Sequence, residues 1–263
     1  MAFRGIDVSK WQTSIDWTKV KASGISFVII RASYGQTTDQ RFKDNITGAL
    51  AQGLNVGVYV YALAKTVEEA VKEADNVLSL VKPYKITYPI CYDVEDANLV
   101  SLPKEIRTDI AIAFCERIES ARYYAMIYSN KNWLENLLNY ERLKPYDIWL
   151  AQWTPKATWA GTYGIWQYGL DAVDGVGNCD GDICYNDYPS IIAKAKLNDL
   201  GPHSVGVGST VKYQGTVYAS SWGIGNKITV NGNFIVKQYI PNRKYGVQIG
   251  GLGWVAESAV SVL

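Results

Sequence analysis

The 263-residue sequence predicts an α/β fold: a modified, TIM-like (β/α) barrel of eight strands and about five helices, followed by a small all-β barrel. Two observations carry this prediction. Up to about residue 197, strand-like and helix-like segments alternate, which requires a parallel sheet with right-handed crossovers. From residue 201 the pattern changes to short strands between glycines, because this last part holds 11 of the 23 glycines.

Eight short apolar segments, rich in β-branched and aromatic residues, are typical of the buried strands of such a barrel. They lie at residues 3–9, 26–33, 55–62, 88–95, 124–129, 147–153, 164–168 and 177–184. Because only about five helices are expected between the eight strands, we expect few helices in the last third of the barrel.

The helix-like segments show helical spacing or a recognisable start. Residues 40–52 place apolar side chains on one helical face. The capping box Thr66-Val67-Glu68-Glu69 opens a helix that ends near Lys82, and Pro103 suits the first position of another. Further helices are expected at 130–138 and 188–197.

Two carboxylates one residue apart, Asp93 and Glu95, end the fourth strand-like segment. In a strand, residues i and i+2 point the same way, with Cα atoms about 6.6 Å apart. The two charges repel each other, and the more buried acid holds its proton longer. A protonated acid beside an ionised one is the arrangement that glycosidic bond cleavage needs.

Further acids are expected near this pair, because the chemistry of a barrel gathers at the C-terminal ends of its strands. Asp7 ends the first strand, and Asp180 and Asp182 lie on the eighth. The first and last strands of a closed barrel are neighbours, so Asp7 and Asp180 should approach each other. Other candidates at the same mouth are Arg31, Tyr59, Tyr61 and Tyr128.

A metal site is the main alternative use for these carboxylates. Residues 178–182 alternate oxygen-bearing side chains, but Ile183 stands where a calcium loop of the EF-hand type needs glycine. Cys91, Cys115, Cys179 and Cys184 follow no zinc spacing and are expected as free thiols, with a Cys179–Cys184 bridge as the alternative. We therefore expect no metal and no cofactor.

Several other functions lack their residues. The only histidine, His203, lies in a linker-like segment, which argues against Ser-His-Asp and Cys-His catalysis. No stripe of Lys and Arg supports nucleic acid binding, and no apolar stretch approaches the ~20 residues that a membrane helix needs. Nucleic acid binding and membrane insertion are therefore not expected.

The chain is expected to divide into a catalytic barrel at 1–200, a linker at 201–209 and a small β-domain at 210–263. Residues 201–263 carry five Lys or Arg against one acid, for a net charge of +4, whereas the rest carries −3. A basic C-terminal region favours an anionic surface such as a cell wall polymer.

Taken together and in order, several motifs resemble the glycoside hydrolase family 25 lysozymes, muramidases of the type found in phage endolysins and autolysins. They are Gly5-Ile6-Asp7-Val8-Ser9, Phe27-Val28-Ile29-Ile30-Arg31-Ala32-Ser33, Gly57-Val58-Tyr59-Val60-Tyr61, the acidic pair, Trp149-Leu150-Ala151-Gln152-Trp153, Trp166-Gln167-Tyr168 and Gly177-Asn178-Cys179-Asp180. Gly208–Val211, Gly215–Ser221 and Gly253-Trp254-Val255 resemble a bacterial SH3-type wall-binding domain more loosely.

This resemblance implies cleavage of the β-1,4 bond between N-acetylmuramic acid and N-acetylglucosamine in bacterial peptidoglycan. Glu95 falls on the general acid of the family, and Asp93 on the partner that stabilises the transition state or orients the 2-acetamido group. Asp7 and Asp180 fall on accompanying acids. The sequence departs from the family at Val60, at Ser33-Tyr34-Gly35 and at Asp182, where the family often has His, Thr-Glu-Gly and Asn.

The substrate-binding candidates are Arg31, Tyr59, Asp182 and four aromatic residues that either stack on sugars or pack in the core: Tyr61, Tyr128, Trp149 and Trp166. The expected partners are peptidoglycan and, through the C-terminal domain, another wall polymer. Since Met1 runs into a strand without a secretory signal, we expect synthesis in a host cytoplasm and release to the wall through a holin-type membrane hole. The alternative functions are a non-catalytic wall-binding protein and another N-acetyl-sugar glycosidase such as a chitinase.

Overall fold

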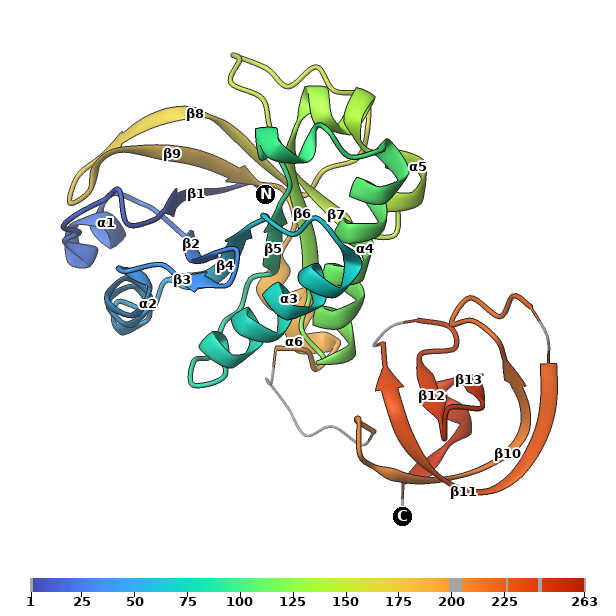
Figure 1. The fold of residues 1–263 in the computed structure, drawn as a ribbon. Coiled ribbons are helices and arrows are strands. Elements are labelled where there is room, and N and C mark those ends of the chain that lie inside the picture. Colours follow the sequence, from blue (N-terminus) through green and yellow to red (C-terminus); the bar gives the residue numbers. More distant parts are fainter. Residues whose placement is uncertain (1, 199–204, 226, 241–242, 263) are drawn as a thin grey trace.

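The computed structural model describes residues 2–198, 205–225, 227–240 and 243–262. They form two separate sheets, a nine-stranded sheet in the N-terminal part and a five-stranded sheet in the C-terminal part (Figure 1). The larger sheet has the order β1-β9-β8-β7-β6-β5-β4-β2-β3, and it closes into a barrel because β1 also pairs with β2. The predicted eight-stranded barrel is thus confirmed, with the two-residue strand β3 (Thr37–Thr38) added at the edge of β2.

The barrel strands lie close to the predicted segments. They are β1 (Phe3–Val8), β2 (Phe27–Tyr34), β4 (Asn55–Tyr61), β5 (Ile90–Asp93), β6 (Ala125–Asn130), β7 (Asp147–Ala151), β8 (Ile165–Val173) and β9 (Gly177–Cys184). All neighbouring pairs from β1 through β2 to β8 are parallel.

The last strand differs from the prediction of a parallel sheet, because β9 runs antiparallel to both β8 and β1. Only three residues separate β8 from β9, which allows a hairpin but no crossover helix. The N-terminal half of β9 therefore lies at the end of the barrel where the other strands finish. In this register Asp180 pairs with Asp7, so the predicted approach of these two residues is confirmed.

Six α-helices are present in the described residues: α1 (Trp17–Ala22), α2 (Phe42–Ala51), α3 (Val67–Val81), α4 (Lys104–Ser120), α5 (Tyr140–Leu143) and α6 (Tyr188–Lys194). Short turns of other helix types occur at η1 (Ala97–Leu99) and η2 (Trp133–Leu137), the latter in place of the helix predicted at 130–138. Thr66 caps α3 by accepting a hydrogen bond from the Glu69 N–H, as the capping box predicts. The sequence analysis missed α1.

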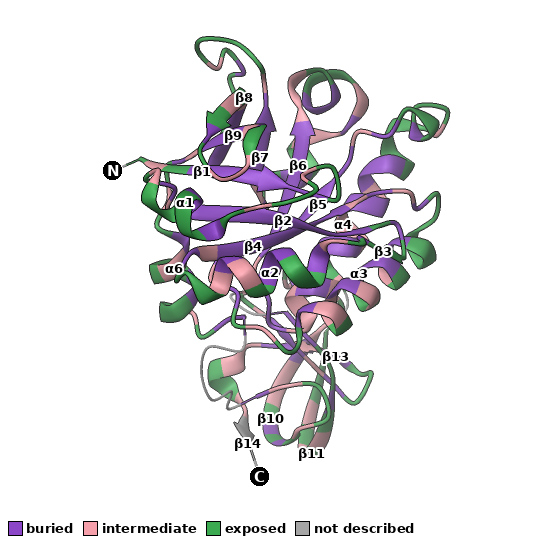
Figure 2. Ribbon diagram, turned by 90° about the vertical axis from the view of Figure 1, so that its left-hand side faces the viewer, coloured by how far each residue is buried: buried purple, intermediate pink, exposed green. Residues whose placement is uncertain are grey.

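Strand alternation divides the buried side chains into two layers. In β2, Val28 and Ile30 pack outward with side chains of the helices, whereas Phe27 and Ile29 fill the barrel interior. Figure 2 shows the result, with strands that are buried along most of their length and helices that are exposed on their outer sides. On every strand, alternate side chains point inward, as Phe27 and Ile29 do on β2. A side chain that reaches the mouth from inside the barrel must therefore belong to the inward-facing set of its strand.

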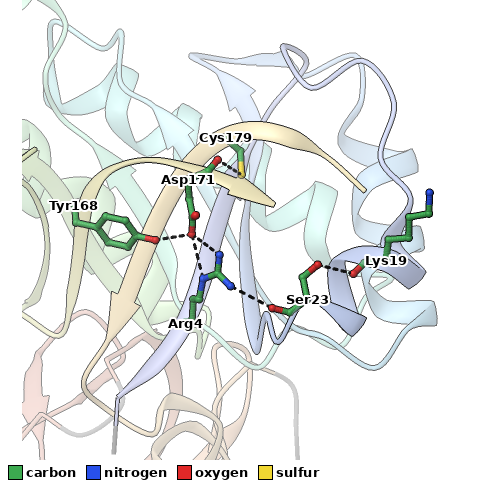
Figure 3. A network of polar contacts seen from close by, with 6 residues as sticks. All are labelled: Arg4, Lys19, Ser23, Tyr168, Asp171 and Cys179. Atoms are coloured by element: carbon green, nitrogen blue, oxygen red, sulfur yellow. Dashed lines mark hydrogen bonds and ion pairs between the residues drawn. The ribbon is translucent and has the colours of Figure 1, made fainter. Parts of the chain in front are cut away.

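A polar network fastens β1 to the β8–β9 hairpin (Figure 3). Arg4 donates two hydrogen bonds to Asp171 Oδ2, at 2.7 and 3.1 Å, and Tyr168 donates a third to the same oxygen at 2.6 Å. A Cβ atom on Gly181 would lie 2.5 Å from the Tyr168 hydroxyl, so only glycine lets this tyrosine lie across β9. The network helps to close the barrel where the helices are few.

The C-terminal sheet is a small barrel with the order β11-β12-β13-β10-β14 and a closing pair between β10 and β11. Its elements are β10 (Thr210–Tyr218), β11 (Lys227–Tyr239), β12 (Val247–Ile249), β13 (Gly253–Val255), η3 (Glu257–Ala259) and β14 (Ser261–Val262). A buried cluster that includes Val211, Val217, Val236 and Ile249 forms its core. Of the predicted linker, residues 201–204 with His203 lie outside the described residues.

The small barrel contacts the large one where β6 begins, at the end opposite the mouth. The Arg122 guanidinium lies 4.5 Å from the centre of the Tyr239 ring and 3.9 Å from a Glu257 oxygen. A second contact pairs an arginine of the small barrel with an acid of the large one: Arg243 Nη2 lies 3.3 Å from Glu119 Oε2 at the end of α4. Two arginines, one from each barrel, thus hold the parts together away from the acidic residues of the mouth.

Candidate active site

A cavity of about 140 Å³ opens at the mouth of the large barrel. Nine of the eleven predicted site residues line it, together with Gln167: Asp7, Arg31, Tyr59, Tyr61, Asp93, Glu95, Tyr128, Trp149 and Asp180. They come from β1, β2, β4, β5 and its following loop, β6, β7 and β9. The C-terminal ends of the parallel strands and the reversed start of β9 bring these distant residues together.

Asp93 and Glu95 both face this cavity, as their spacing predicts, although β5 ends at Asp93 and Glu95 lies in the loop beyond it. Asp93 is 5% exposed, and its Oδ1 atom is buried without a hydrogen-bond partner among the described residues. Glu95 is less buried, and its Oε2 accepts a hydrogen bond from Asn130 Nδ2 at 3.4 Å. The first acid therefore has an unused buried oxygen, and the second reaches the open part of the site.

Burial raises the pKa of both acids. The pKa of Asp93 lies well above its ordinary value because of burial and the charges of Glu95 and Asp7, while Arg31 opposes the shift. Burial also raises the pKa of Glu95, against the hydrogen bond from Asn130. In the free protein, burial thus favours a proton on Asp93 even more than on Glu95, which differs from the expectation of an ionised Asp93.

Three further acids meet beside this pair. Burial and the charge of Asp180 raise the pKa of Asp7 well above its ordinary value, and burial and the charge of Asp7 do the same for Asp182. Asp182 Oδ1 accepts a hydrogen bond from Trp149 Nε1, whereas its buried Oδ2 has no hydrogen-bond partner among the described residues. Burial and the repulsion between these carboxylates favour bound protons, which lower the negative charge of the site.

Gln167 is a site residue that the sequence analysis missed. Its Nε2 donates to Asp7 Oδ2 at 2.8 Å, and its Oε1 accepts hydrogen bonds from the Tyr128 hydroxyl at 3.1 Å and from Trp153 Nε1 at 3.0 Å. Gln167 thus orients an acid, a buried tyrosine and an exposed tryptophan at once. Its parity on β8, two residues after the interior Ile165, is the signal that could have identified it.

Asp39 was also missed, and it fixes the predicted site residue Arg31. Arg31 Nε lies 2.7 Å from Asp39 Oδ2, and both side chains are buried. Asp39 Oδ1 accepts a further hydrogen bond from the Arg41 N–H. The guanidinium is therefore held in place at the border of the cavity, where its charge lowers the pKa of Asp93.

Of the two alternatives for Trp149 and Trp166, sugar stacking or core packing, the structure shows packing for both. Trp149 is 1% exposed, forms the floor of the cavity and donates its indole N–H to Asp182 Oδ1 at 2.7 Å. Trp166 is buried outside the cavity lining and donates to the Gln152 carbonyl. Because its neighbours Ile165 and Gln167 point inward, Trp166 must point outward, so it is excluded from the site. Asp182, behind Trp149, is a supporting residue of the floor.

The cysteines do not form a bridge. Cys91, Cys115, Cys179 and Cys184 are all free and buried. Among residues 2–198, 205–225, 227–240 and 243–262, no three His, Cys, Asp or Glu side chains are arranged to hold a metal ion. In the same described part of the chain, no helix has the length and apolar character needed to span a membrane.

A closed (β/α) barrel with paired carboxylates in a cavity at its mouth is the architecture of glycoside hydrolases. The profile of Glycosyl hydrolases family 25 matches residues 6–174, more than half of the chain, and the chain belongs to this family. The predicted resemblance is thereby confirmed for the large barrel.

Individual relatives agree with this classification. The autolytic lysozyme of Clostridium acetobutylicum is 28% identical over 211 residues, which cover 79% of this chain and 58% of that protein. Lysozyme M1 of Streptomyces globisporus is 28% identical over 209 residues, covering 73% of this chain and 69% of the relative. The chain therefore spans only a little over half the length of the clostridial lysozyme.

Solved structures show the same fold. The bacterial lysozyme from Streptomyces coelicolor superposes with a TM-score of 0.63 at 25% identity, covering 76% of this chain and 98% of that one. The modular autolysin LytC from Streptococcus pneumoniae, solved with a synthetic peptidoglycan ligand, gives a TM-score of 0.65 at 26% identity, covering 70% and 47%.

Proposed function

We propose that this protein is a muramidase that hydrolyses the β-1,4 bond between N-acetylmuramic acid and N-acetylglucosamine in bacterial peptidoglycan, outside the membrane. One observation carries the proposal most directly. Asp93 and Glu95 face the same cavity, and Asp93 Oδ1 is buried there without a hydrogen-bond partner. A buried acceptor of this kind favours a ligand that brings a donor, such as the amide N–H of an N-acetyl sugar.

Glu95 is the general acid of this mechanism. Its raised pKa keeps the proton bound to higher pH than in an ordinary glutamate, and a bound sugar that excludes water raises this pKa further. The proton passes to the glycosidic oxygen as the bond to the anomeric carbon breaks. Asn130, which donates to Glu95 Oε2, holds the carboxyl group toward the open side of the cavity.

Asp93 is the partner that orients the substrate and stabilises the positive charge. In the free protein its pKa is raised, but an amide N–H that donates to Oδ1 favours the ionised form. Substrate binding thus drives the two acids toward opposite protonation states, which the cleavage requires. Asp7 and Asp180 keep the cavity acidic beside the developing oxocarbenium ion, and the raised pKa values of Asp7 and Asp182 limit the repulsion.

The decisive test is Glu95→Gln, with exposed Glu68→Gln on α3 as the matched control. Glu95→Gln should abolish the loss of turbidity of purified cell walls while the circular dichroism spectrum is unchanged, and Glu68→Gln should behave as the wild type. Mass spectrometry of the released fragments should show N-acetylmuramic acid at the new reducing ends. Near-normal turnover by Glu95→Gln would contradict the assignment of Glu95 as the general acid.

The same digestion separates the alternative functions. Reducing ends that carry N-acetylglucosamine, or faster cleavage of chitin than of walls, would indicate another N-acetyl-sugar glycosidase. Wall binding by the wild type without any released fragment would indicate a non-catalytic binding protein.

We also propose that the small barrel, residues 210–263, anchors the enzyme to an anionic wall polymer. The Tyr218 and Tyr245 rings lie 4.1 Å apart between centroids. Lys227 Nζ lies 5.1 Å from the first ring and Lys244 Nζ 5.4 Å from the second. Exposed ammonium groups beside aromatic rings suit a polymer that combines negative charge with apolar faces.

Charge reversal tests this anchoring role. The double variant Lys227→Glu and Lys244→Glu should sediment less with purified walls at low salt, whereas Lys212→Glu, an exposed lysine on β10, serves as the control. Hydrolysis of soluble fragments should be unchanged, because the small barrel lies away from the mouth. Equal loss of binding in all variants would reject this pair of lysines as the anchor.

A further inference from the structure

A second cavity adjoins the acidic one and has a different character. It has a volume of about 480 Å³, and Arg31 and Tyr61 line both cavities. Its other lining residues are Lys10, Trp11, Tyr34, Thr37, Thr38, Asp39 and Gln40. The shared wall makes the second cavity the neighbouring space for the next sugars of a polysaccharide bound with one bond at Glu95.

The second cavity offers strongly exposed aromatic side chains, whereas Tyr59, Tyr128 and Trp149 in the acidic cavity are buried. Trp11 is 73% exposed and Tyr34 is 46% exposed, although both are large aromatic side chains. The Tyr34 ring stacks on Tyr61, with centroids 4.8 Å apart and planes inclined by 15°. Exposed aromatic rings beside a cavity are suitable surfaces for the apolar faces of sugar rings.

The charge of this cavity is also opposite in sign. Lys10 is exposed, its Nζ lies 4.9 Å from the centre of the Trp11 ring, and it forms no ion pair with any described carboxylate. The charge of Arg31, in contrast, is matched by Asp39 at 2.7 Å. Lys10 is therefore the cation of this cavity that is free to meet a negative group of a ligand.

The loop that carries Lys10 and Trp11 is fixed before any ligand binds. The Lys10 N–H donates to Asp39 Oδ2 at 3.1 Å, the oxygen that also holds Arg31. The Ser9 N–H donates to Gln12 Oε1 at 2.9 Å, which closes the turn around the two residues. A preorganised loop loses little conformational entropy when a ligand binds.

We propose that this cavity is a subsite for a sugar whose substituent carries a carboxylate, with Trp11 and Tyr34 against the ring and Lys10 paired with the carboxylate. The inference rests on the proposed muramidase function and specifies which feature of the glycan the enzyme selects. Peptidoglycan offers carboxylates from two sources: the lactyl group of N-acetylmuramic acid where no peptide is attached, and the peptide itself where one is attached. Lys10 thus distinguishes peptidoglycan from uncharged polymers of N-acetylglucosamine.

The test compares three soluble substrates: glycan strands with their peptides, strands stripped of peptides by an amidase so that the lactyl carboxylate is free, and an N-acetylglucosamine oligomer. Lys10→Ala and Lys10→Glu are measured beside Lys43→Ala, which removes an exposed lysine of α2 outside the cavity. For Lys10→Ala, the ratio of the KM for charged strands to the KM for the oligomer should rise about threefold, the size expected for one exposed ion pair. Lys10→Glu should raise this ratio further.

The substrate that responds identifies the carboxylate. A rise for the stripped strands alone indicates the lactyl carboxylate, which is an amide where a peptide is attached. A rise for the peptide-bearing strands alone indicates a carboxylate of the peptide, and a rise for both indicates that Lys10 pairs with either carboxylate. An unchanged ratio, or the same rise with Lys43→Ala, would overturn the proposal.

The same comparison on the Glu95→Gln background, with dissociation constants from calorimetry, separates the subsite from the catalytic assignment. A Lys10-dependent affinity without any cleavage by the wild type would reject the muramidase but keep the subsite. Cleavage by the wild type without a Lys10-dependent preference would keep the muramidase assignment but reject the subsite.

Discussion

Trp149 donates its indole N–H to the buried Asp182 carboxyl group at 2.7 Å, so two residues expected to contact sugar contact each other instead. Trp149 also packs edge-on against Tyr128, with centroids 4.6 Å apart, and against Tyr59 at 6.1 Å. This aromatic floor shields the Asp7–Asp182 pair from solvent. The acidic cavity is thus supported from below by a hydrogen bond that the enzyme needs for stability rather than for sugar stacking.

Replacing this donor should destabilise the protein. Trp149→Phe keeps most of the ring volume but leaves a buried carboxyl oxygen without its partner, at a cost of about 1–3 kcal/mol. Urea denaturation should show this loss, whereas Trp11→Phe, at an exposed position, should change the free energy of unfolding by less than about 0.5 kcal/mol. Adding Asp182→Asn to Trp149→Phe should recover part of the lost free energy of unfolding. If the effects of the two substitutions simply add in the double variant, a direct coupling between Trp149 and Asp182 is contradicted.

Asn130 should set the alkaline limit of activity. Its hydrogen bond favours the ionised form of Glu95 and so lowers the pKa of this acid. Asn130→Ala removes the donor, which raises the pKa of Glu95 and keeps it protonated to higher pH. The descending alkaline limb of kcat/KM against pH should therefore move upward in pH. An unchanged or downward-shifted limb would show that Glu95 does not act as the acid.

Buried Glu73 should make stability depend on pH. Burial raises its pKa from 4.5 to about 7, while the Tyr92 hydroxyl and the Leu63 N–H donate to its oxygens. Between these two pH values the folded state holds a proton that the unfolded state has released. The stability that this proton provides is complete below pH 4.5 and is lost as the pH rises through 7.

Glu73→Gln removes this titration. The free energy of unfolding of Glu73→Gln, relative to that of the wild type, should therefore increase by about 3 kcal/mol between pH 4.5 and 8, since each pKa unit corresponds to about 1.4 kcal/mol. Chemical denaturation at several pH values measures this difference. The exposed Glu68→Gln should show no such trend, and a difference independent of pH would contradict a raised pKa of Glu73.

The sequence predicted the strands and the acids of the mouth because strand ends are local features. The ends of β1 and β5 carry Asp7 and Asp93 in any parallel barrel, whatever the details of packing. The reversal of β9, in contrast, depends on a short hairpin, and it decides that Asp180 rather than Asp182 lines the cavity. The signal was present in the eight residues between the predicted strands 164–168 and 177–184, which are too few for a crossover helix.

The remaining site residues depend on contacts between distant parts of the chain. Gln167 contacts Asp7 although 160 positions separate them in the sequence, and the residues next to either one do not predict this contact. Trp11 follows the first strand by only three residues, but its large exposed fraction becomes visible only once the loop is fixed by Asp39. Alternation along the strand excludes Trp166 from the site once Ile165 is known to lie in the barrel interior.

The contact between the two barrels leads to a final prediction about Arg122. Its guanidinium lies over the Tyr239 ring, lies 3.9 Å from Glu257 and donates to the Val205 carbonyl at 3.3 Å, so one side chain ties three points of the C-terminal part to the large barrel. Arg122→Ala removes all three contacts. Calorimetry should then show the small barrel unfolding in a separate transition at lower temperature, while Arg142→Ala, which removes exposed ion pairs within the large barrel, should leave the trace nearly unchanged. The mouth lies at the opposite end of the barrel, so Arg122→Ala should hydrolyse soluble fragments at the wild-type rate. A loss of this rate would show that the small barrel supports the active site through the strands.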